Sequence, residues 1–267
     1  MGLRKYFTLT RMGIIEALHY RLSLYVKIIG NLLYLILIYY LWKAIFHSAG
    51  TDVVNGMTFE STMVYLVLAS ALYGFMEMYV VWEIGRNIQK GDIVVYMLKP
   101  MEYRHYLFWE LSGSLIVGFL TTVLPTFIVV AIVTHGTIPL GINLAYFVVS
   151  VALAMIINFQ IDFMVGNICF FTESIWGINM MKQVIVLLLS GATIPIAFFP
   201  EAVKNVVNVL PFVAIYDSPL TILLNGNGDS AMVMEKLLIQ LGWAVGLTIL
   251  SHIFWKISVR QVTVNGG

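Results

Sequence analysis

The chain has 267 residues, of which 60% are hydrophobic and only 11% are charged. Soluble domains carry roughly 25% charged residues, so the composition excludes an ordinary soluble domain and indicates a membrane protein. Its 15 Lys and Arg nearly balance its 14 Asp and Glu, and we therefore expect no nucleic-acid partner.

The first predicted element is an amphipathic helix over residues 3–21. Its apolar side chains fall within one arc of a helical wheel, whereas Lys5, Glu16 and His19 lie on another arc. The members of the apolar arc are Leu3, Phe7, Ile14 and Leu18. This pattern predicts a helix lying in the inner membrane interface. The alternative is a basic flank that only anchors the orientation of the chain.

Six apolar stretches approach the ~20 residues that are needed to cross a hydrocarbon core of ~30 Å. They lie near residues 24–46, 60–82, 106–133, 141–169, 183–199 and 235–256. The fifth is short, contains Pro195 and is followed by Pro200, so we expect this helix to tilt or break. The prediction is an all-α membrane protein with six transmembrane helices in a single domain, residues 1–267.

The distribution of Lys and Arg predicts the orientation. With the amino terminus inside, most cations fall on inner segments, and the outer side keeps only Lys43, Lys204 and Lys236. Inner loops of membrane proteins are enriched in Lys and Arg, so both termini are predicted to be cytoplasmic.

Two acidic residues lie inside apolar stretches, Glu77 in the second and Asp162 in the fourth. A charge at this depth is costly and faces a protein interior or a cavity. Both residues either pair with Lys or Arg from the inner loops or contact a substrate or a cation. Tyr65, Leu72 and Tyr79, spaced by seven residues, either line a cavity for a flat apolar ligand or serve helix packing.

The longest inner loop, residues 83–105, is predicted to hold a short helix. Gly91 is suited to end the preceding helix, and Asp92 is a favourable N-cap. Lys99 complements the carboxyl end of the helix dipole, and Pro100 prevents the helix from continuing.

Two i,i+4 pairs, Ile93 with Met97 and Val94 with Leu98, build an apolar ridge on this short helix. In a hydrated loop such a ridge needs a partner. The partner is either a separate protein or the bilayer surface and the chain's own helix ends, and the sequence pattern favours neither.

The inner loop EIGRNIQKGDIVVYMLKPMEYRHYLFWEL resembles that of the ATP-binding-cassette transporter type-2 permeases. There a Gly-Asp-Ile stretch leads to Leu-Lys-Pro and a basic, aromatic tail. A second stretch, residues 187–226, resembles the family's fifth span and the outer segment that follows it. The two stretches occur in the family's order and on the same sides of the membrane as in the family. Together with the six spans, the amino-terminal helix and the cytoplasmic termini, they make the resemblance extend over essentially the full chain.

The resemblance implies that residues 91–99 are a coupling helix, which inserts into a cleft on a separate ATPase subunit. Gly91, Asp92, Lys99 and Pro100 would shape this helix. The side chains implied to fill the cleft are Ile93, Val94, Met97 and Leu98. Those implied to contact its rim are Glu83, Arg86, Arg104 and His105.

The resemblance also concerns the outer side and the dimer axis. Residues 200–226 would be a re-entrant segment in an outer gate, or, as the alternative, an ordinary surface loop. The second and fifth spans would meet around the substrate route, where Gly191 and Thr193 allow close approach.

The implied function is a non-catalytic permease subunit of an exporter in the plasma (inner) membrane. It would pair with a second copy or a similar permease, and with two ATPase subunits that carry ATP and Mg²⁺. The cargo would be an amphipathic small molecule, drug, peptide or lipid-like compound. The chain contains no G-x-x-x-x-G-K-[ST] pattern and no histidine spacing typical of zinc, so we expect no cofactor or metal in it.

Two other functions remain open from the residues. One is an intramembrane enzyme that uses Glu77 and Asp162 as a carboxylate pair. The other is a membrane scaffold that transports nothing. Only the permease requires a stoichiometric nucleotide-binding partner.

Overall fold

A computed structural model describes residues 2–134, 141–172, 175–224 and 229–261. The chain is predominantly helical in these ranges, and a small antiparallel hairpin pairs β1 (Val53–Val54) with β2 (Met57–Thr58). Five helical segments are long and apolar enough to cross a membrane: Tyr25–Ala49, Phe59–Gln89, Tyr103–Val133, Ile142–Phe170 and Ser230–Gln261.

The helices follow one another along the chain, with a π-helical segment at Phe119–Val123 between α6 and α7. Their bounds are α1 (Gly2–His19), α2 (Arg21–Ala49), α3 (Phe59–Met76), α4 (Val80–Gln89), α5 (Ile93–Met97), α6 (Tyr103–Gly118), α7 (Leu124–Val133), α8 (Ile142–Asn167), α9 (Ile175–Leu189), α10 (Glu201–Val207), α11 (Asp217–Leu223) and α12 (Ser230–Ser258).

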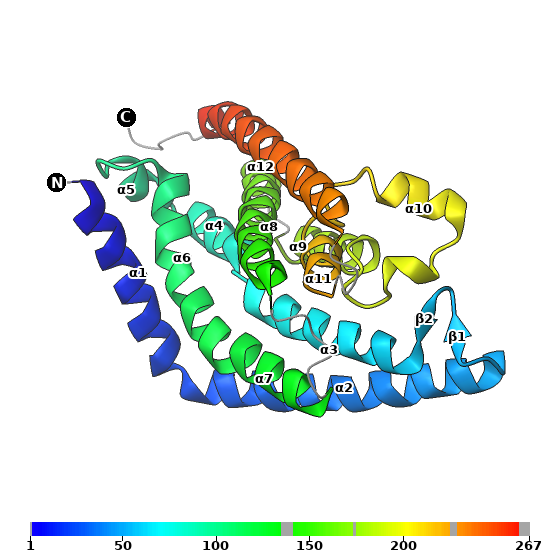
Figure 1. Ribbon diagram of the computed structural model, residues 1–267. Coiled ribbons are helices and arrows are strands. Elements are labelled where there is room, and N and C mark those ends of the chain that lie inside the picture. The colour runs from blue at the N-terminus through cyan, green and yellow to red at the C-terminus, as the bar shows by residue number, and fades with distance from the viewer. Residues whose placement is uncertain (1, 135–140, 173–174, 225–228, 262–267) are drawn as a thin grey trace.

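Helices α8 and α12 pack along each other in parallel (Figure 1). Ser150 donates a hydrogen bond to Gln240 at 2.7 Å, and Ser251 donates one to Gln160 at 2.6 Å. Residue numbers rise together on the two helices, so these buried polar pairs set the register. Polar side chains in a membrane interior satisfy each other across helices in this way.

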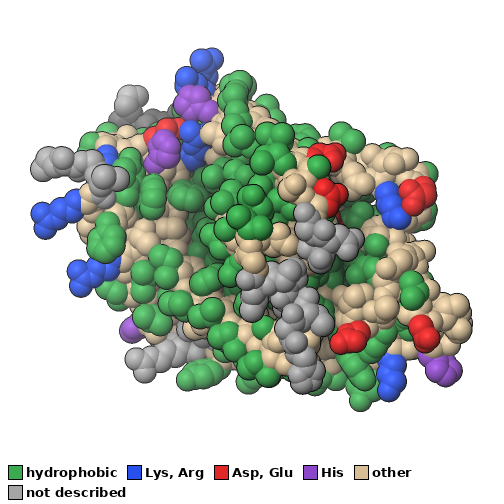
Figure 2. Space-filling view, in the orientation of Figure 1, with side chains coloured by type: hydrophobic (Ala, Val, Ile, Leu, Met, Phe, Trp, Pro, Cys, Tyr) green, Lys and Arg blue, Asp and Glu red, His purple; other side chains and the backbone are tan. Residues whose placement is uncertain are grey.

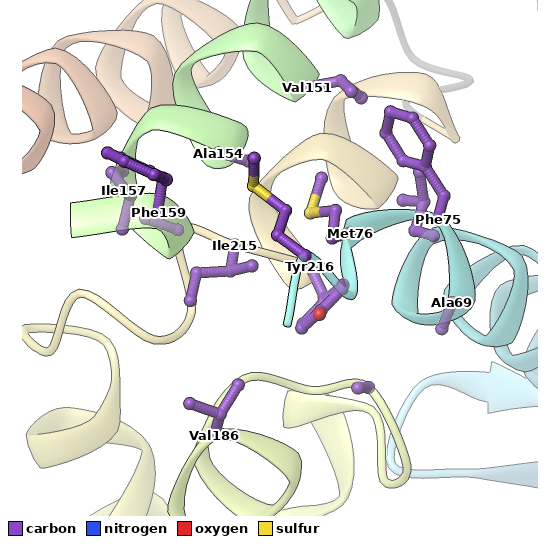
Figure 3. Packing of buried hydrophobic residues seen from close by; sticks show 14 of the residues in the cluster. Ala69, Phe75, Met76, Val151, Ala154, Ile157, Phe159, Val186, Ile215 and Tyr216 are labelled. Carbon is purple, nitrogen blue, oxygen red and sulfur yellow. The ribbon is translucent and has the colours of Figure 1, made fainter. Parts of the chain in front are cut away.

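A single hydrophobic core joins this helix pair to α3 and α11. Figure 3 shows Met76 near the end of α3, close to Tyr216 and to side chains of α8 such as Ala154. The core therefore lies next to the point where α3 ends and α4 begins.

Helix α2 lies along the outside of the molecule (Figure 1). Only 11% of its most apolar stretch is buried, against 67% in Phe59–Gln89. Its apolar side chains therefore face the surroundings, as expected for a helix in contact with lipid.

The two ends of the molecule differ in content. The start of α1, the short helix α5 and the end of α12 lie at one end, and α10 and the hairpin lie at the other (Figure 1). Charged side chains gather toward these ends, and the face between them is mainly hydrophobic (Figure 2). This banding fits a protein whose middle sits in a bilayer.

Helix α1 packs along α6 (Figure 1). The rings of Tyr6 and Trp109 are 5.3 Å apart, and a Cβ on Gly13 would lie 2.1 Å from the carbonyl oxygen of Glu110. Only glycine permits this approach. Phe7 and Leu18 of the predicted apolar arc are 74% and 48% exposed, so these two side chains point away from α6, whereas Ile14 is half-buried.

The fifth apolar stretch breaks as predicted, but its helix begins and ends earlier than the predicted span 183–199. Helix α9 covers Ile175–Leu189, so the stretch 183–199 is helical only in its first half. Gly191 then adopts a left-handed conformation (φ 82°), and Pro195 has no N–H with which to continue a helix. With 15 residues, α9 is ~22 Å long at ~1.5 Å per residue and is too short to span the core unaided.

Candidate functional site

The second membrane-crossing segment is interrupted at residues 77–79, between α3 and α4. Tyr79 adopts a left-handed backbone conformation (φ 52°), which is uncommon outside glycine. The Met76 carbonyl next to the break accepts a hydrogen bond from Asn158 Nδ2 at 3.0 Å. Freed backbone groups at membrane depth are tolerated only when the protein satisfies them, and α8 does so here.

Glu77 lies at this break and pairs with α2. Its carboxylate is 3.3 Å from Lys27 Nζ and accepts a hydrogen bond from the Tyr79 hydroxyl at 3.1 Å. The Lys27 ammonium also lies 4.8 Å from the centre of the Tyr79 ring. These contacts hold α2 to the broken helix.

Asp162 is paired as well, with Lys182 of α9 at 2.8 Å. Both side chains are nearly buried, so the pair ties α8 to α9 inside the protein. Each carboxylate thus has its own lysine, as the ion-pair alternative predicts. No hydrogen bond joins Glu77 to Asp162, although both lie in the described part of the chain, so the geometry gives no support to a shared carboxylate pair.

Two cavities of about 660 Å³ each meet at Glu77. The first lies between α2, α3, α7 and the turn after α9, and its walls are mostly apolar, for example Leu35, Val67 and Val129. The second lies between α1, α2, α4 and α6 and has a more polar lining. Lys27 and Glu77 line both cavities.

A third, small cavity of about 30 Å³ lies on the other side of the break. Asn158, Asp162, Asn179 and Lys182 are among its lining residues, together with Glu77. Its volume suits about one water molecule. Glu77 is therefore common to all three cavities.

The residues predicted to lie on a substrate route do not form one lining. Glu77, Tyr79 and Thr193 border the large cavities, whereas Leu72 is only 2% exposed and belongs to the core. Tyr65 is buried too, so the seven-residue spacing reflects helix packing for these two residues.

Tyr65 takes part in a buried polar cluster that the sequence does not signal. Its hydroxyl donates to Asp217 at 3.2 Å, and Lys236 of α12 lies 3.2 Å from the same carboxylate. Gly191 packs against it, since a Cβ there would lie 2.7 Å from the Tyr65 oxygen. No periodicity connects positions this far apart in the chain, which is why only the fold reveals the cluster.

The short helix between α4 and α6 has narrower bounds than predicted. Gly91 adopts the left-handed conformation (φ 77°) and follows the end of α4, in agreement with its expected part in breaking that helix. Helix α5 covers Ile93–Met97, five residues, rather than 91–99. The Asp92 side chain makes no capping hydrogen bond to any described residue, so its predicted cap is not formed.

The exposed face of α5 also differs from the predicted ridge. Ile93 is 3% exposed and points into the core, so it cannot fill a cleft on another protein. Val94 is half-buried against the same core. Met97 and Leu98 are exposed as predicted, and Val95 joins them at 58% exposed. We call Val95, Met97 and Leu98 the exposed apolar face.

Lys99 holds the turn after α5. Its ammonium lies 4.0 Å from the ring centre of Tyr96 and 3.9 Å from that of Tyr106, a double cation–π contact. Burial raises the pKa of the Tyr96 phenol above its ordinary value, so this ring stays neutral near pH 7. The lysine thus fixes the segment before Pro100 in place.

The four residues predicted to contact the rim of the cleft do not form one surface. Arg104 is 8% exposed and donates hydrogen bonds to the Thr248 carbonyl and the Ser251 hydroxyl, so it joins α6 to α12 and is not a rim residue. His105 is exposed beside Glu102, at 3.3 Å. Glu83 and Arg86 form an ion pair with each other on the surface of α4.

The stretch 200–226 is folded in two parts within the described residues. Helix α10 exposes Val203 and Val206 at the end of the molecule opposite α5. Helix α11, in contrast, is almost wholly buried against α8 and α12. A plain surface loop does not describe this segment, because its second half belongs to the core.

Among the described residues, no group of three or more His, Cys, Asp or Glu side chains is placed to hold a metal ion. A sequence family described as "ABC-2 family transporter protein" matches residues 32–266. No curated protein sequence matches the chain.

Proposed function

Because the chain belongs to the ABC-2 family of transporter proteins, we propose that it is the permease subunit of an ATP-driven exporter that moves an amphipathic molecule out of the cell. Two ATPase subunits would bind ATP and Mg²⁺, and the chain would pair with a second copy or a similar permease. Its termini would be cytoplasmic, in the inner (plasma) membrane.

The observation that carries the proposal is the exposed apolar face at α5. Val95, Met97 and Leu98 project from a short helix that is anchored by buried Ile93 and by Lys99 between its two tyrosines. A rigid apolar protrusion suits a cleft in a partner, since docking removes its surface from water without further ordering of the chain.

The path from this face to the cavities supports a mechanical role. Helix α5 follows α4 after the Gly91 turn, and α4 begins at the break beside Glu77. Gly166 of α8 packs on Ile84, since a Cβ there would lie 2.6 Å from the Ile84 side chain, so α4 would move with α8. A push on α5 would therefore be taken up at residues 77–79, where the large cavities meet.

The cavities support an amphipathic cargo. One is mostly apolar, and the other combines carboxylates with aromatic side chains. A molecule with an apolar body and a polar head would find both environments on the two sides of Glu77.

The test combines co-purification with a single substitution. We expect the chain to purify with a nucleotide-binding subunit and to stimulate its ATP hydrolysis. Met97→Asp should abolish that stimulation and efflux, because docking would bury an unpaired charge. Val53→Asp is the matched control, since Val53 is also exposed and apolar but lies on the hairpin at the opposite end. Unchanged coupling in Met97→Asp would refute the docking role of α5.

A further inference from the structure

The cavity between α1, α2, α4 and α6 carries more negative than positive charge. Four glutamates and two cations line it: Glu16, Glu77, Glu83, Glu110, Lys27 and Arg86. Both cations are already engaged, Lys27 by Glu77 and Arg86 by Glu83. Among the described side chains, no Lys, Arg or His lies within 4.0 Å of the Glu16 or Glu110 carboxylate.

These two carboxylates, which have no cationic partner among the described side chains, lie on the two helices that meet at the α1–α6 contact. Glu110 is half-buried and accepts a hydrogen bond from the Tyr106 hydroxyl at 3.1 Å. The backbone of Glu110 touches Gly13, and Glu16 follows Gly13 by about one helical turn. The tight crossing therefore fixes the spacing of the carboxylates before any ligand arrives.

Aromatic side chains complete the lining of this cavity. Tyr20, Tyr79 and Trp82 border it, and only the Tyr79 ring is in cation–π contact with a described lysine. The negative faces of aromatic rings attract organic cations, most strongly in the case of Trp. The neighbouring apolar cavity shares Ile28, Gly74 and Thr121 with this one, so the two cavities lie side by side.

We propose that Glu16, Glu110 and Trp82 form a binding site for an organic cation with a bulky apolar body, such as a hydrophobic amine, quaternary ammonium or phosphonium. The head binds between the carboxylates, and the body extends past Glu77 into the apolar cavity. The inference rests on the proposed function, since it names the cargo that the permease would carry.

The charge and the walls of the cavity argue against other ligands. An anionic lipid headgroup or a free phosphate would meet an excess of carboxylates, which would repel it. A hard metal cation needs six or more oxygen ligands close together, and among the described residues no group of three or more acidic, His or Cys side chains is placed to hold a metal ion.

The experiment measures binding to the purified chain in detergent, without any ATPase. Tetraphenylphosphonium and tetraphenylborate are suitable probes, because they share size and shape and differ only in the sign of their charge. We expect the cation to bind saturably and the anion not to bind. Glu110→Gln keeps an acceptor for the Tyr106 hydroxyl and should lower the affinity for the cation by about tenfold.

Two further variants complete the test. Glu16→Gln, at an exposed position that folding does not depend on, should weaken binding by about threefold. Glu201→Gln is the matched control and should change nothing, since Glu201 pairs with Lys204 at the other end of the molecule. Equal binding of both probes, or unchanged cation affinity in the Glu16→Gln and Glu110→Gln variants, would overturn the site.

These outcomes separate the site from the proposed function. Cation binding without a co-purifying ATPase would support the proposed binding site and contradict the proposed exporter function. A coupled ATPase without cation binding would do the reverse.

Discussion

The side of the molecule built on α8, α11 and α12 differs from the side built on α1, α2, α6 and α7 in where its polar groups find partners. On the first side, which we call the frame, polar side chains bind one another inside the protein, as Ser150 and Gln240 do. On the second, the cavity wall, large spaces remain between the helices, and carboxylates face into them.

The difference indicates which part of the molecule would move as one body and which part can deform. The frame has its register set by buried hydrogen bonds and ion pairs, and each would have to break before its helices slid. The cavity wall contains α2, whose most apolar stretch is 11% buried against 44% for that of α8. It also contains the π-helical segment Phe119–Val123, a kind of irregularity that is frequent at functional sites. We therefore expect substitutions in the frame to affect stability and those in the wall to affect transport.

The largest effect should come from Lys182→Met, which leaves Asp162 buried without its partner. Removal of one member of a buried ion pair costs about 3–5 kcal/mol in the free energy of unfolding. The measurement is unfolding of the purified protein in detergent. Lys204→Met is the control, since its partner Glu201 is 83% exposed and surface pairs contribute at most about 1 kcal/mol. Similar losses in the two variants would remove the distinction between frame and surface.

Gly113→Val is an exception within the cavity wall, where we expect a loss of stability, because Gly113 lies at the close contact between α1 and α6. A Cβ at Gly113 would lie 2.4–2.5 Å from backbone atoms of α1, which cannot rotate away. We expect a loss of about 3 kcal/mol, at the upper end for overpacking, and faster proteolysis of α1. Gly30→Val is the control, because a Cβ there has open space within 4 Å. If α1 stays protected in Gly113→Val, the α1–α6 crossing is not as close as described.

Gln240→Leu should destabilise the frame by roughly 2 kcal/mol, since Gln240 makes three hydrogen bonds and each interhelical bond in a membrane contributes about 0.6 kcal/mol. The same unfolding assay reports the effect. Gln261→Leu, at an exposed position after α12, lies outside the frame and serves as the comparison. An unchanged midpoint for Gln240→Leu would mean that packing alone holds α8 to α12.

The smallest effect is expected for Leu37→Ala on α2, where the side chain is 70% exposed. A substitution away from the packed interior changes stability by less than about 0.5 kcal/mol. Leu220→Ala provides the contrast, because Leu220 is fully buried in α11 and such truncations cost about 2–5 kcal/mol. A large loss in Leu37→Ala would show that α2 belongs to the frame.

The segment between α4 and α6 shows how much of the local structure the sequence predicts. The pattern around Gly91 and Pro100 predicts a short helix between two spans, and the structure contains one. The i,i+4 spacing treats Ile93 and Met97 as one face, yet α5 is only five residues long and the chain turns at both of its ends. The angle at which α5 meets the core determines that Ile93 is buried and Val95 is exposed. This angle cannot be predicted from the spacing of residues along the helix.

Arg104 shows the same limit for charged residues. In the sequence it belongs to a basic, aromatic tail and is predicted on the surface. In the structure its guanidinium reaches two groups of α12 that lie more than 140 residues away. The hydrogen-bond partners of a cationic side chain can come from distant parts of the sequence, so its burial depends on which helix the fold places beside it.

The sequence by itself determined the membrane class, most of the apolar stretches, the membership of the permease family and the place of the inner helix. These follow from composition, local periodicity and order along the chain. Only the tertiary structure decided the break at Glu77, the lysine partners of both carboxylates and the division into frame and cavity wall. The reason is physical: lipid and protein interior are equally apolar, so hydrophobicity marks a helix as buried in the membrane without telling which side faces another helix.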